Sequence, residues 1–469
     1  MMRRMRTRPM PPWMTELMKE FLKPPYFLQY LHQHPASVQK PAAPGEPPGA
    51  TANPAPPTQV SASPVDGGKT TVAKSKPLAG HGTGTADEAA PSTRPGRSPV
   101  RTAEVIPAAH GAVLTRDGRS DGDRPVVVRE GRWQNAFRAA GIPPGVAKRY
   151  GWVIQAAEPV STVVRVHTKR GRYALKRADV SPQRVRFLHQ LIEHLHAEGF
   201  TDIAPFALTK EGDPFVQRGD NLYYATRWTA GNPVNFSALP QVEAAAGTLA
   251  RFHEASRGFE TEHEAPDWVF NLADLTRRRA EDLKTMLVRA EAAGSPDGFD
   301  QTLLRLAPQL RQDAERSLRI LESAPCQEFL REDAKIPGVC HLDVIPPNLM
   351  YTPDKRVVLL DLDLAAYAPR VMDLGHLLRR VLQAQNWRHE AAYTCFSAYH
   401  AVRPLRAEEY LLIQGLLTFP YRAWRIAYTR YRLFRDERQL DELREYAEQE
   451  RHRQSFLEAY ENQLRLRVP

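Results

Sequence analysis

Apolar residues follow different patterns along the chain, and these patterns divide it into regions. Residues 131–230 hold short apolar runs separated by turn residues, which is typical of strands. Residues 231–469 repeat their apolar positions every three to four residues, which is typical of helices. Residues 36–130 are rich in Pro, Ala, Gly, Ser and Thr, and cannot bury enough apolar surface to offset the entropy lost on ordering. We therefore predict a disordered linker followed by a strand-rich and a helix-rich region.

The strand-rich region carries the signals of a small antiparallel sheet with one long helix. A short helix is predicted at 131–142. The long helix at 181–199 has Ser181 in the N-cap position and Pro182 in its first turn. Strands are predicted at 151–156, 162–167, 172–177, around 206–208, at 213–217 and at 222–228.

The helix-rich region begins near Gly231. Residues 241–256 have a clear helical period, and 270–330 predict one or two long helices. Residues 338–378 interrupt the helices with two short strand-like runs, and helices resume from Leu374. The predicted fold is therefore α+β, with a small sheet lobe and a larger, mostly helical lobe.

A short segment at 1–35 precedes the linker. Trp13, Phe21 and Leu31 are among its apolar residues, which form short amphipathic turns. This segment is either a frayed tail or a docking segment for a partner, held on the linker as a tether.

The net charge does not indicate a further function for the folded part of the chain. The chain has 469 residues and a formal net charge of +10. Residues 1–130 contribute 17 basic and 11 acidic residues, a net of +6, which leaves +4 for the rest. Because most of the excess lies in the tail, a nucleic-acid function of the folded part is not expected.

The cysteine and hydrophobicity patterns indicate in which cellular compartment the protein is made. Its three cysteines form no CxxC pair and no zinc-like spacing, so we expect synthesis in the reducing cytoplasm without a disulfide framework. The basic start is followed by no apolar stretch of signal-peptide length, and no run of about 18 apolar residues predicts a membrane span.

Candidate chemistry is concentrated in residues 338–378. His341, Asp343 and Asn348 form the pattern H-x-D-x-x-x-x-N, and Asp361 follows an apolar run. Phosphoryl transfer requires a carboxylate that orients the acceptor hydroxyl, and further oxygen ligands for the metal ions that neutralise the phosphates. Mg²⁺ prefers such hard oxygen ligands, which Asp and Asn supply.

An upstream lysine strengthens this interpretation. Lys176 lies in an apolar strand, from which a lysine can bind the phosphates of a nucleotide. Taken singly, Lys176 could extend along an apolar surface to solvent, Asn348 could cap a turn, and His341 could be a core histidine. Asp354 fits the turn between the two short strands. The order of lysine strand, helix, helical lobe and acidic loops is that of a protein-kinase-like fold.

The chain at this point resembles the aminoglycoside phosphotransferase and choline kinase branch of the kinase-like fold. Within that branch it is most similar to the bacterial spore coat CotS family, through "YALKR", "LARFHEAS", "CHLDVIPPNL" and "VVLLDLDLAAYAPRVMDL". The resemblance implies ATP, with GTP as an alternative, and Mg²⁺ as cofactors. It implies the following roles: Asp343 as catalytic carboxylate with His341 as its support, Asn348 and Asp361 as metal ligands, Lys176 on the phosphates, and Asp373 as a structural brace. Asp363 is left open as a supporting group or a further metal ligand.

The sequence departs from the family pattern around the nucleotide. The loop 157–162 lacks the glycines that let backbone N–H groups approach phosphate, so we expect the hydroxyls of Ser161 and Thr162 to substitute. Glu193 is the expected helix partner of Lys176. Trp228, in the hinge sequence TRWTAG, is a further candidate for nucleotide binding.

Two functions remain open from the sequence. The first is a phosphotransferase that acts on a hydroxyl of a small-molecule or surface acceptor. The second is an inactive kinase-like scaffold in the spore coat, whose tail binds other coat proteins. Residues 420–435 carry several arginines, which either form a solvated helix face or suit an anionic acceptor better than a polycationic aminoglycoside.

Overall fold

The computed structural model describes residues 132–465, except for 161–162, 179, 264–270 and 337. The segment predicted at 1–35, the linker predicted at 36–130, and Ser161 and Thr162 therefore lie outside the described residues. None of the helices in the described part is both long and apolar enough to cross a membrane.

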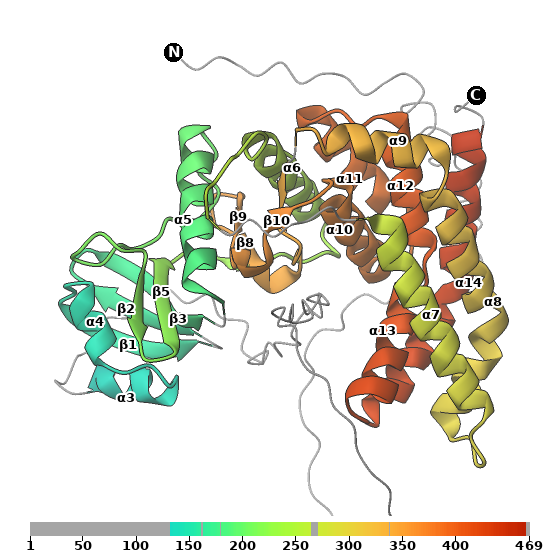
Figure 1. Cartoon of the computed structure of the whole chain (residues 1–469), viewed down its shortest axis with the longest axis horizontal. Coiled ribbons are helices and arrows are strands. Elements are labelled where there is room, and N and C mark those ends of the chain that lie inside the picture. The colour runs from blue at the N-terminus through green and yellow to red at the C-terminus, as the bar shows by residue number, and fades with distance from the viewer. Residues whose placement is uncertain (1–131, 161–162, 179, 264–270, 337, 466–469) are drawn as a thin grey trace, which may run out of the picture. The chain divides into compact units, whose positions relative to one another are not determined.

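Five strands form the antiparallel sheet of the N-terminal lobe, in the order β1-β2-β3-β5-β4 (Figure 1). They are β1 (Ile154–Val160), β2 (Val163–Thr168), β3 (Gly171–Ala178), β4 (Phe215–Arg218) and β5 (Asn221–Arg227). The register places Lys176 of β3 opposite Val163 on one side and Tyr224 on the other. The strand predicted around 206–208 is wrong, since only a single bridge joins Phe206 to Thr226.

One face of this sheet packs on two short helices, α3 (Arg132–Ala139) and α4 (Gly145–Arg149), of which α4 was not predicted. Val164, Val166 and Leu175 point to this face and are fully buried with Phe137 of α3 and Val146 of α4. Their alternation along β2 is the two-residue period expected of a strand with one buried face. Lys176, the next residue after Leu175, points to the other face.

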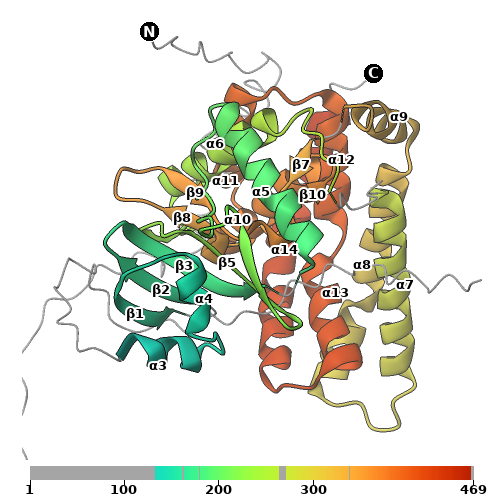
Figure 2. The ribbon, with the colours of Figure 1, turned by 60° about the vertical axis from the view of Figure 1, so that its left-hand side comes forward.

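Helix α5 (Pro182–Ala197) lies between the sheet and the helical lobe (Figure 2). Its predicted start is confirmed, because the Ser181 hydroxyl accepts a hydrogen bond of 3.1 Å from the N–H of Arg184, and Pro182 occupies the first turn. Phe187 and Leu191 are fully buried against the helical lobe. Each contributes roughly 1.5–3 kcal/mol through apolar burial, which fixes the sheet against the larger lobe.

The C-terminal lobe consists mainly of helices. They are α6 (Leu239–Ala255), α7 (Leu272–Glu291), α8 (Gly298–Leu321), α9 (Ala324–Asp333), α10 (Val371–Ala384), α11 (His389–Val402), α12 (Ala407–Thr418), α13 (Tyr421–Tyr428) and α14 (Arg438–Arg465). The stretch 270–330 holds three helices instead of the predicted one or two. A new helix begins at the capping box of Asp297 and Asp300, and another follows Ser323.

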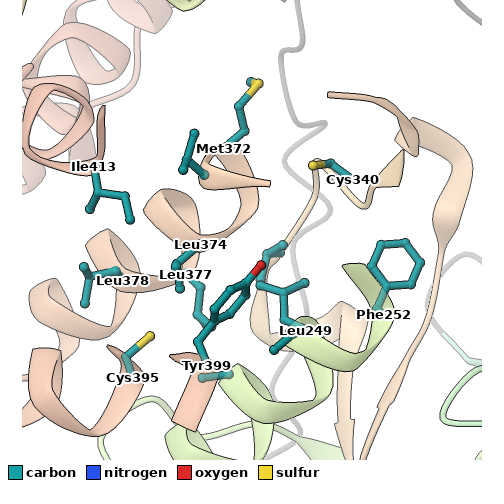
Figure 3. Close-up of a cluster of buried hydrophobic side chains, with 14 of the residues drawn as sticks. Leu249, Phe252, Cys340, Met372, Leu374, Leu377, Leu378, Cys395, Tyr399 and Ile413 are labelled. Carbon is teal, nitrogen blue, oxygen red and sulfur yellow. The ribbon is translucent and has the colours of Figure 1, made fainter. Parts of the chain in front are cut away.

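The core of this lobe lies where α6, α10, α11 and α12 meet. Figure 3 shows Tyr399 of α11 among Leu249 of α6 and Leu374 and Leu377 of α10, all of them fully buried. Cys340, from a short strand, lies beside this group and is a free, buried thiol. This core holds the helices that carry the loops between the two lobes.

Four short strands and two tight turns form the segment that interrupts the helices. β7 (Val339–Cys340) pairs with β10 (Ala366–Tyr367), and β8 (Leu349–Tyr351) pairs with β9 (Val357–Leu359) and with β6 (Asn232–Pro233). Gly231 just before β6 has φ +158, and a Cβ there would clash with the carbonyl oxygen of Tyr351, so only glycine fits. Asp354 lies in the β8–β9 turn, where it accepts a bond of 2.5 Å from the Thr352 hydroxyl, as predicted.

Candidate active site

Lys176 connects the two lobes through two carboxylates. Its Nζ lies 2.8 Å from Asp361 Oδ1 and 2.8 Å from Asp363 Oδ2, both in the loop after β9. The Tyr224 hydroxyl donates a bond of 2.5 Å to the other oxygen of Asp363, and its ring centre lies 4.9 Å from Nζ. Strand register explains the tyrosine, because residue 224 stands opposite residue 176 on the same face.

The expectation that Glu193 pairs with Lys176 is wrong. The Glu193 side chain is 65% exposed, and its carboxylate lies 4.0 Å from His189 on its own helix. Asp363, which the sequence left open, takes the place of the helix glutamate instead. The lysine is thus held by the loop that also carries Asp361.

The charges of this group reinforce each other. Burial alone would lower the pKa of Lys176, but its neighbours Tyr224, Asp363 and Asp361 outweigh burial and raise that pKa well above its usual range. Burial opposes the ionisation of Asp361, and Lys176 nevertheless lowers its pKa. Burial and the charge of Asp363 raise the pKa of Tyr224, so its hydroxyl keeps the proton that it donates. At neutral pH the group is an ammonium between carboxylates.

Local backbone geometry aims Asp361 at the lysine. Asp361 has φ 58 and ψ 70, a left-handed conformation that Asp tolerates better than most residues. The 3-10 turn Leu362–Leu364 follows at once and places Asp363 beside it. Arg184 of α5 holds this turn by donating to the carbonyl oxygens of Asp363, at 3.0 Å, and Ala365. No sequence signal marked Arg184 for this role.

The loop of His341 and Asp343 carries the second part of the site. His341 is fully buried; its Nδ1 accepts a bond of 3.3 Å from the N–H of Asp343, and its Nε2 donates to the Leu360 carbonyl at 2.8 Å. These two contacts select the Nε2–H tautomer. His341 therefore links the Asp343 loop to the residue before Asp361, which is a positioning role.

Asp373 supports the same loop through its side chain. Its two carboxylate oxygens accept bonds from the N–H groups of His341, at 2.6 Å, and Leu342, at 2.8 Å. Leu342 has φ 63, a conformation that is strained for a branched side chain, and these bonds hold it. The predicted bracing is confirmed, although Asp373 caps the loop and not its own helix, α10, which begins at Val371.

A buried histidine completes the brace. His253 Nε2 lies 3.0 Å from Asp373, and its Nδ1 lies 2.7 Å from the Tyr399 hydroxyl. Burial lowers the pKa of His253, so it is a neutral donor. Burial opposes the ionisation of Asp373, but the bonds from His253 and the loop lower its pKa. Cys340 lies close enough to these two residues for a shared ion, but its thiol contacts the Ala368 carbonyl at 3.2 Å, so this cluster is a hydrogen-bonded support.

Asn348 orients the Asp343 carboxylate. Its Nδ2 donates to Asp343 Oδ2 at 2.7 Å and to the Asp343 carbonyl at 3.0 Å. Asp343 Oδ1 is buried and has no hydrogen-bond partner among the described residues. A buried carboxylate oxygen without a donor is a ready acceptor for a substrate hydroxyl. The Asn348 main chain also accepts a bond of 2.9 Å from the Leu360 N–H, which joins this loop to the Asp361 loop.

The donor set fits a hard metal ion. Asn348 uses its amide nitrogen toward Asp343, so its amide oxygen is left for a ligand, and Asp361 supplies carboxylate oxygen. Trp228 follows the last residue of β5. Its ring centre lies 5.0 Å from the Arg165 guanidinium carbon, and its main-chain N–H donates to the Arg172 carbonyl at 2.9 Å. The contacts of Trp228 therefore lie on β2 and β3.

Residues 152–408, more than half of the chain, match the sequence profile described as the phosphotransferase enzyme family. The chain belongs to this family. The match spans every site residue named above, from Lys176 to Asp373, and it confirms the resemblance and the enzyme class that the sequence predicted. It ends before α13.

Two relatives of this phosphotransferase agree with the assignment. Spore coat protein S of Bacillus subtilis (strain 168) is 26% identical over 259 residues, which cover 55% of this chain and 73% of that protein. The crystal structure of an aminoglycoside phosphotransferase from Alicyclobacillus acidocaldarius is 37% identical, covers 74% of this chain and 98% of that chain, and superposes with a TM-score of 0.66. The kinase-like fold with a sheet lobe and a helical lobe is thereby confirmed.

Proposed function

We propose that the protein transfers the γ-phosphoryl group of ATP to a hydroxyl of an acceptor molecule. The observation that carries this proposal is the joining of two loops at Leu360. This residue is bonded to both His341 and Asn348, so that the Asp343 carboxylate and the Lys176–Asp361 pair belong to one hydrogen-bonded unit. Turn capping explains these polar residues singly, but not this convergence from β3 and two loops of the other lobe.

Each residue has a distinct part in the transfer. The acceptor hydroxyl donates its hydrogen bond to Asp343 Oδ1, the buried oxygen without a partner. The acceptor oxygen forms a bond to the γ-phosphorus, the bond to the β–γ bridging oxygen breaks, ADP leaves, and Asp343 takes the hydroxyl proton. Asn348 keeps the carboxylate oriented through its bond of 2.7 Å.

Lys176 is the phosphate-binding cation in this proposal. Its ammonium exchanges a carboxylate oxygen of Asp361 for phosphate oxygens, while Asp363 and Tyr224 keep it in place. Asp361, once released, and the Asn348 amide oxygen are the side-chain ligands for Mg²⁺, which neutralises charge on the phosphates when it is bound. GTP offers the same phosphates, so the nucleotide base is left to experiment.

A transfer assay tests the proposal. The full chain is incubated with Mg²⁺, γ-labelled ATP and pools of hydroxyl compounds, and label transfer is measured for the wild type and Asp343→Asn. The variant keeps the size of the side chain but lacks the basic oxygen, and the expected loss of rate is about 10²–10⁴-fold. Glu193→Gln, on the exposed side of α5, is the matched control and should transfer at the wild-type rate. Equal rates for wild type and Asp343→Asn would contradict the proposal.

A coat scaffold is the second candidate function. The similarity to spore coat protein S favours it, and so does the closed Lys176–Asp361 pair, which a nucleotide must open. Under this alternative the protein resides in the spore coat and its N-terminal segment binds coat proteins. Deleting residues 1–130 should then remove the protein from the coat, and the wild-type chain should show no transfer activity.

A further inference from the structure

A group of arginines lies on three helices, α7, α10 and α13, and α10 also carries Asp373 of the site described above. The arginine group consists of Arg279 on α7, Arg379 and Arg380 on α10, and Arg425 on α13. Tyr421 of α13 stands at its centre: the guanidinium carbons of Arg279 and Arg379 lie 4.9 Å and 4.3 Å from its ring centre. α7 and α13 pack against each other, which brings these side chains together (Figure 1).

The positive charges of the arginine group lower the pKa values of basic side chains around it. Burial lowers the pKa of Arg379, and Arg380, Arg279 and Arg425 lower it further. Burial and the charges of Arg379, Arg279 and Arg380 lower the pKa of His376 to about 3. Guanidinium groups keep their proton in proteins, so this repulsion is not relieved by ionisation.

Other buried arginines of the same lobe are paired with carboxylates, and Arg379 and Arg380 differ from them in this respect. Arg453 lies 2.7 Å from both Asp313 and Glu450, and Arg370 lies 2.6 Å from Glu409. Within the described residues, neither Arg379 nor Arg380 has a carboxylate within 4.0 Å, although only 8% of Arg379 is exposed. Arg379 donates a long hydrogen bond of 3.4 Å to the neutral side chain of Gln383. A buried guanidinium charge that no carboxylate neutralises opposes folding, and an anionic ligand would offset that cost.

One member of the arginine group, Arg380, interacts electrostatically with the catalytic carboxylate. Burial lowers the pKa of Arg380, and the negative charge of Asp343 acts against that effect, so the two groups are within electrostatic reach. Arg380 Nε is buried without a hydrogen-bond partner in the described part of the chain, as is Asp343 Oδ1. One unsatisfied donor and one unsatisfied acceptor therefore lie on neighbouring elements, α10 and the loop that it supports.

We propose that the arginine group binds the acceptor and selects one that carries an anionic oxygen group, a carboxylate or a phosphate ester, at a distance from the hydroxyl that receives the phosphoryl group. This inference rests on the proposed function and names its substrate class. Guanidinium groups bind both anions through paired N–H donors. A polycationic aminoglycoside would be repelled by the same side chains, so the acceptor differs in charge from an aminoglycoside.

The first test compares matched acceptors. ATP-dependent phosphorylation is measured for series that share one hydroxyl scaffold, such as glucose, glucuronate, glucose 6-phosphate and glucosamine, and the corresponding three- and four-carbon polyols, acids and phosphate esters; kanamycin is added as a polycationic acceptor. The acceptors that are turned over should carry a carboxylate or a phosphate, and the two anionic arms tell which one is preferred. Turnover of neutral or cationic members at equal or higher kcat/KM would overturn the inference.

The second test isolates the arginine. For the best anionic acceptor, Arg380→Gln should raise KM about tenfold to a hundredfold with a smaller change in kcat, and Arg380→Lys should recover part of the loss. Arg444→Gln removes one positive charge from the exposed face of α14 and should behave as wild type. An equal fall in kcat/KM for anionic and neutral acceptors in Arg380→Gln would also overturn the inference.

Binding of inorganic phosphate separates this inference from the proposed function. Calorimetric titration of the full chain with inorganic phosphate requires no ATP turnover, and Arg380→Gln should weaken the binding. If the phosphate site depends on Arg380 but no ATP is consumed, the proposed transfer fails and the anion site stands. If ATP is consumed with neutral acceptors and phosphate binding ignores Arg380, the transfer stands and the anion site fails.

Discussion

The two charged regions of the site are built in opposite ways. On the nucleotide side, Lys176 has two carboxylates at 2.8 Å. Asp373 likewise accepts hydrogen bonds from the N–H groups of the loop that carries His341. On the acceptor side, Arg379 and Arg380 repel each other and no carboxylate neutralises them at ion-pair distance within the described residues. The first region is neutralised by the protein's own carboxylates, and the second is the region that we propose an anionic ligand neutralises.

This difference separates what the fold requires from what the substrate requires. Paired charges hold the two lobes together and stabilise the folded state before any ligand binds. Unpaired like charges lower the stability of the free protein and return that free energy when an anion binds. Removing a charge should therefore have opposite effects on stability in the two regions.

Asp373→Ala should have the largest effect and would break the support of the nucleotide side. It leaves the N–H groups of His341 and Leu342 and the buried His253 without their acceptor. The free energy of unfolding should fall by about 4 kcal/mol, measured by urea denaturation. Asp354→Ala, in the exposed β8–β9 turn, is the control, with an expected loss below about 1 kcal/mol. A loss of similar size in both variants would remove the special role of Asp373.

Lys176→Met comes next and tests the paired charges directly. It leaves Asp361 and Asp363 facing each other without the ammonium, although Tyr224 still donates to Asp363. Because Asp361 is 39% exposed and solvent screens it, we expect a loss of about 2 kcal/mol, less than for a fully buried pair. Thermal unfolding of both proteins measures the change. An increase in stability would show that the lysine is not satisfied by its carboxylates.

Lowering the pH should affect the two regions differently. His376 has a folded pKa of about 3, below its usual value near 6.5, so its contribution is present above pH 6.5 and is lost as the pH falls toward 3. The loss approaches roughly 1.4 kcal/mol for each pH unit in that window. The paired Lys176 and Asp361 have raised and lowered pKa values, so their contribution is constant between about pH 4 and 10.

Unfolding measured from pH 7 to pH 4 tests this contrast. His376→Gln should reduce the fall in stability over that window, because one titrating histidine is gone, while His253 and His389, whose pKa values burial also lowers, keep their share. Lys176→Met should keep the wild-type slope at a lower overall stability. A slope that is unchanged in His376→Gln and altered in Lys176→Met would reverse the assignment.

Arg380→Gln should have the smallest effect on stability, and of the opposite sign. Removing one of the mutually repelling charges should raise the free energy of unfolding of the ligand-free protein by roughly 0.5–1 kcal/mol. Arg444→Gln on the surface should change it by less than about 0.5 kcal/mol. Destabilisation by Arg380→Gln would mean that its charge is already satisfied in the free protein.

Local signals made much of the fold predictable. Ser181 and Pro182 specify the start of α5 through contacts within a few residues, and the two-residue period of Val164 and Val166 specifies a strand with one buried face. Asp354 was predictable as a turn residue for the same reason. The strand around 206–208 failed, since apolar residues there pack into the core without a ladder of hydrogen bonds.

The site was predictable as a set of residue types but not as a set of contacts. Glu193 was a reasonable partner for Lys176, but the rotation of α5 turns Glu193 to solvent and presents Arg184 to the loop. That rotation is set by packing against the other lobe, which no local pattern encodes. Arg379 and Arg380 are likewise unremarkable in a helical sequence, and only the packed structure shows that Arg379 is buried and Arg380 half-buried.

The most direct test of the central claim is the thermal stability of the full chain with ATP and Mg²⁺. A nucleotide that takes Lys176 from Asp361 should raise the free energy of unfolding by about 2.7 kcal/mol at one hundred times Kd. Glu193→Gln should show the same rise, and Lys176→Met should show little or none. An unchanged melting temperature of the wild type at millimolar ATP, or an equal rise in Lys176→Met, would contradict the assignment of this site to the nucleotide.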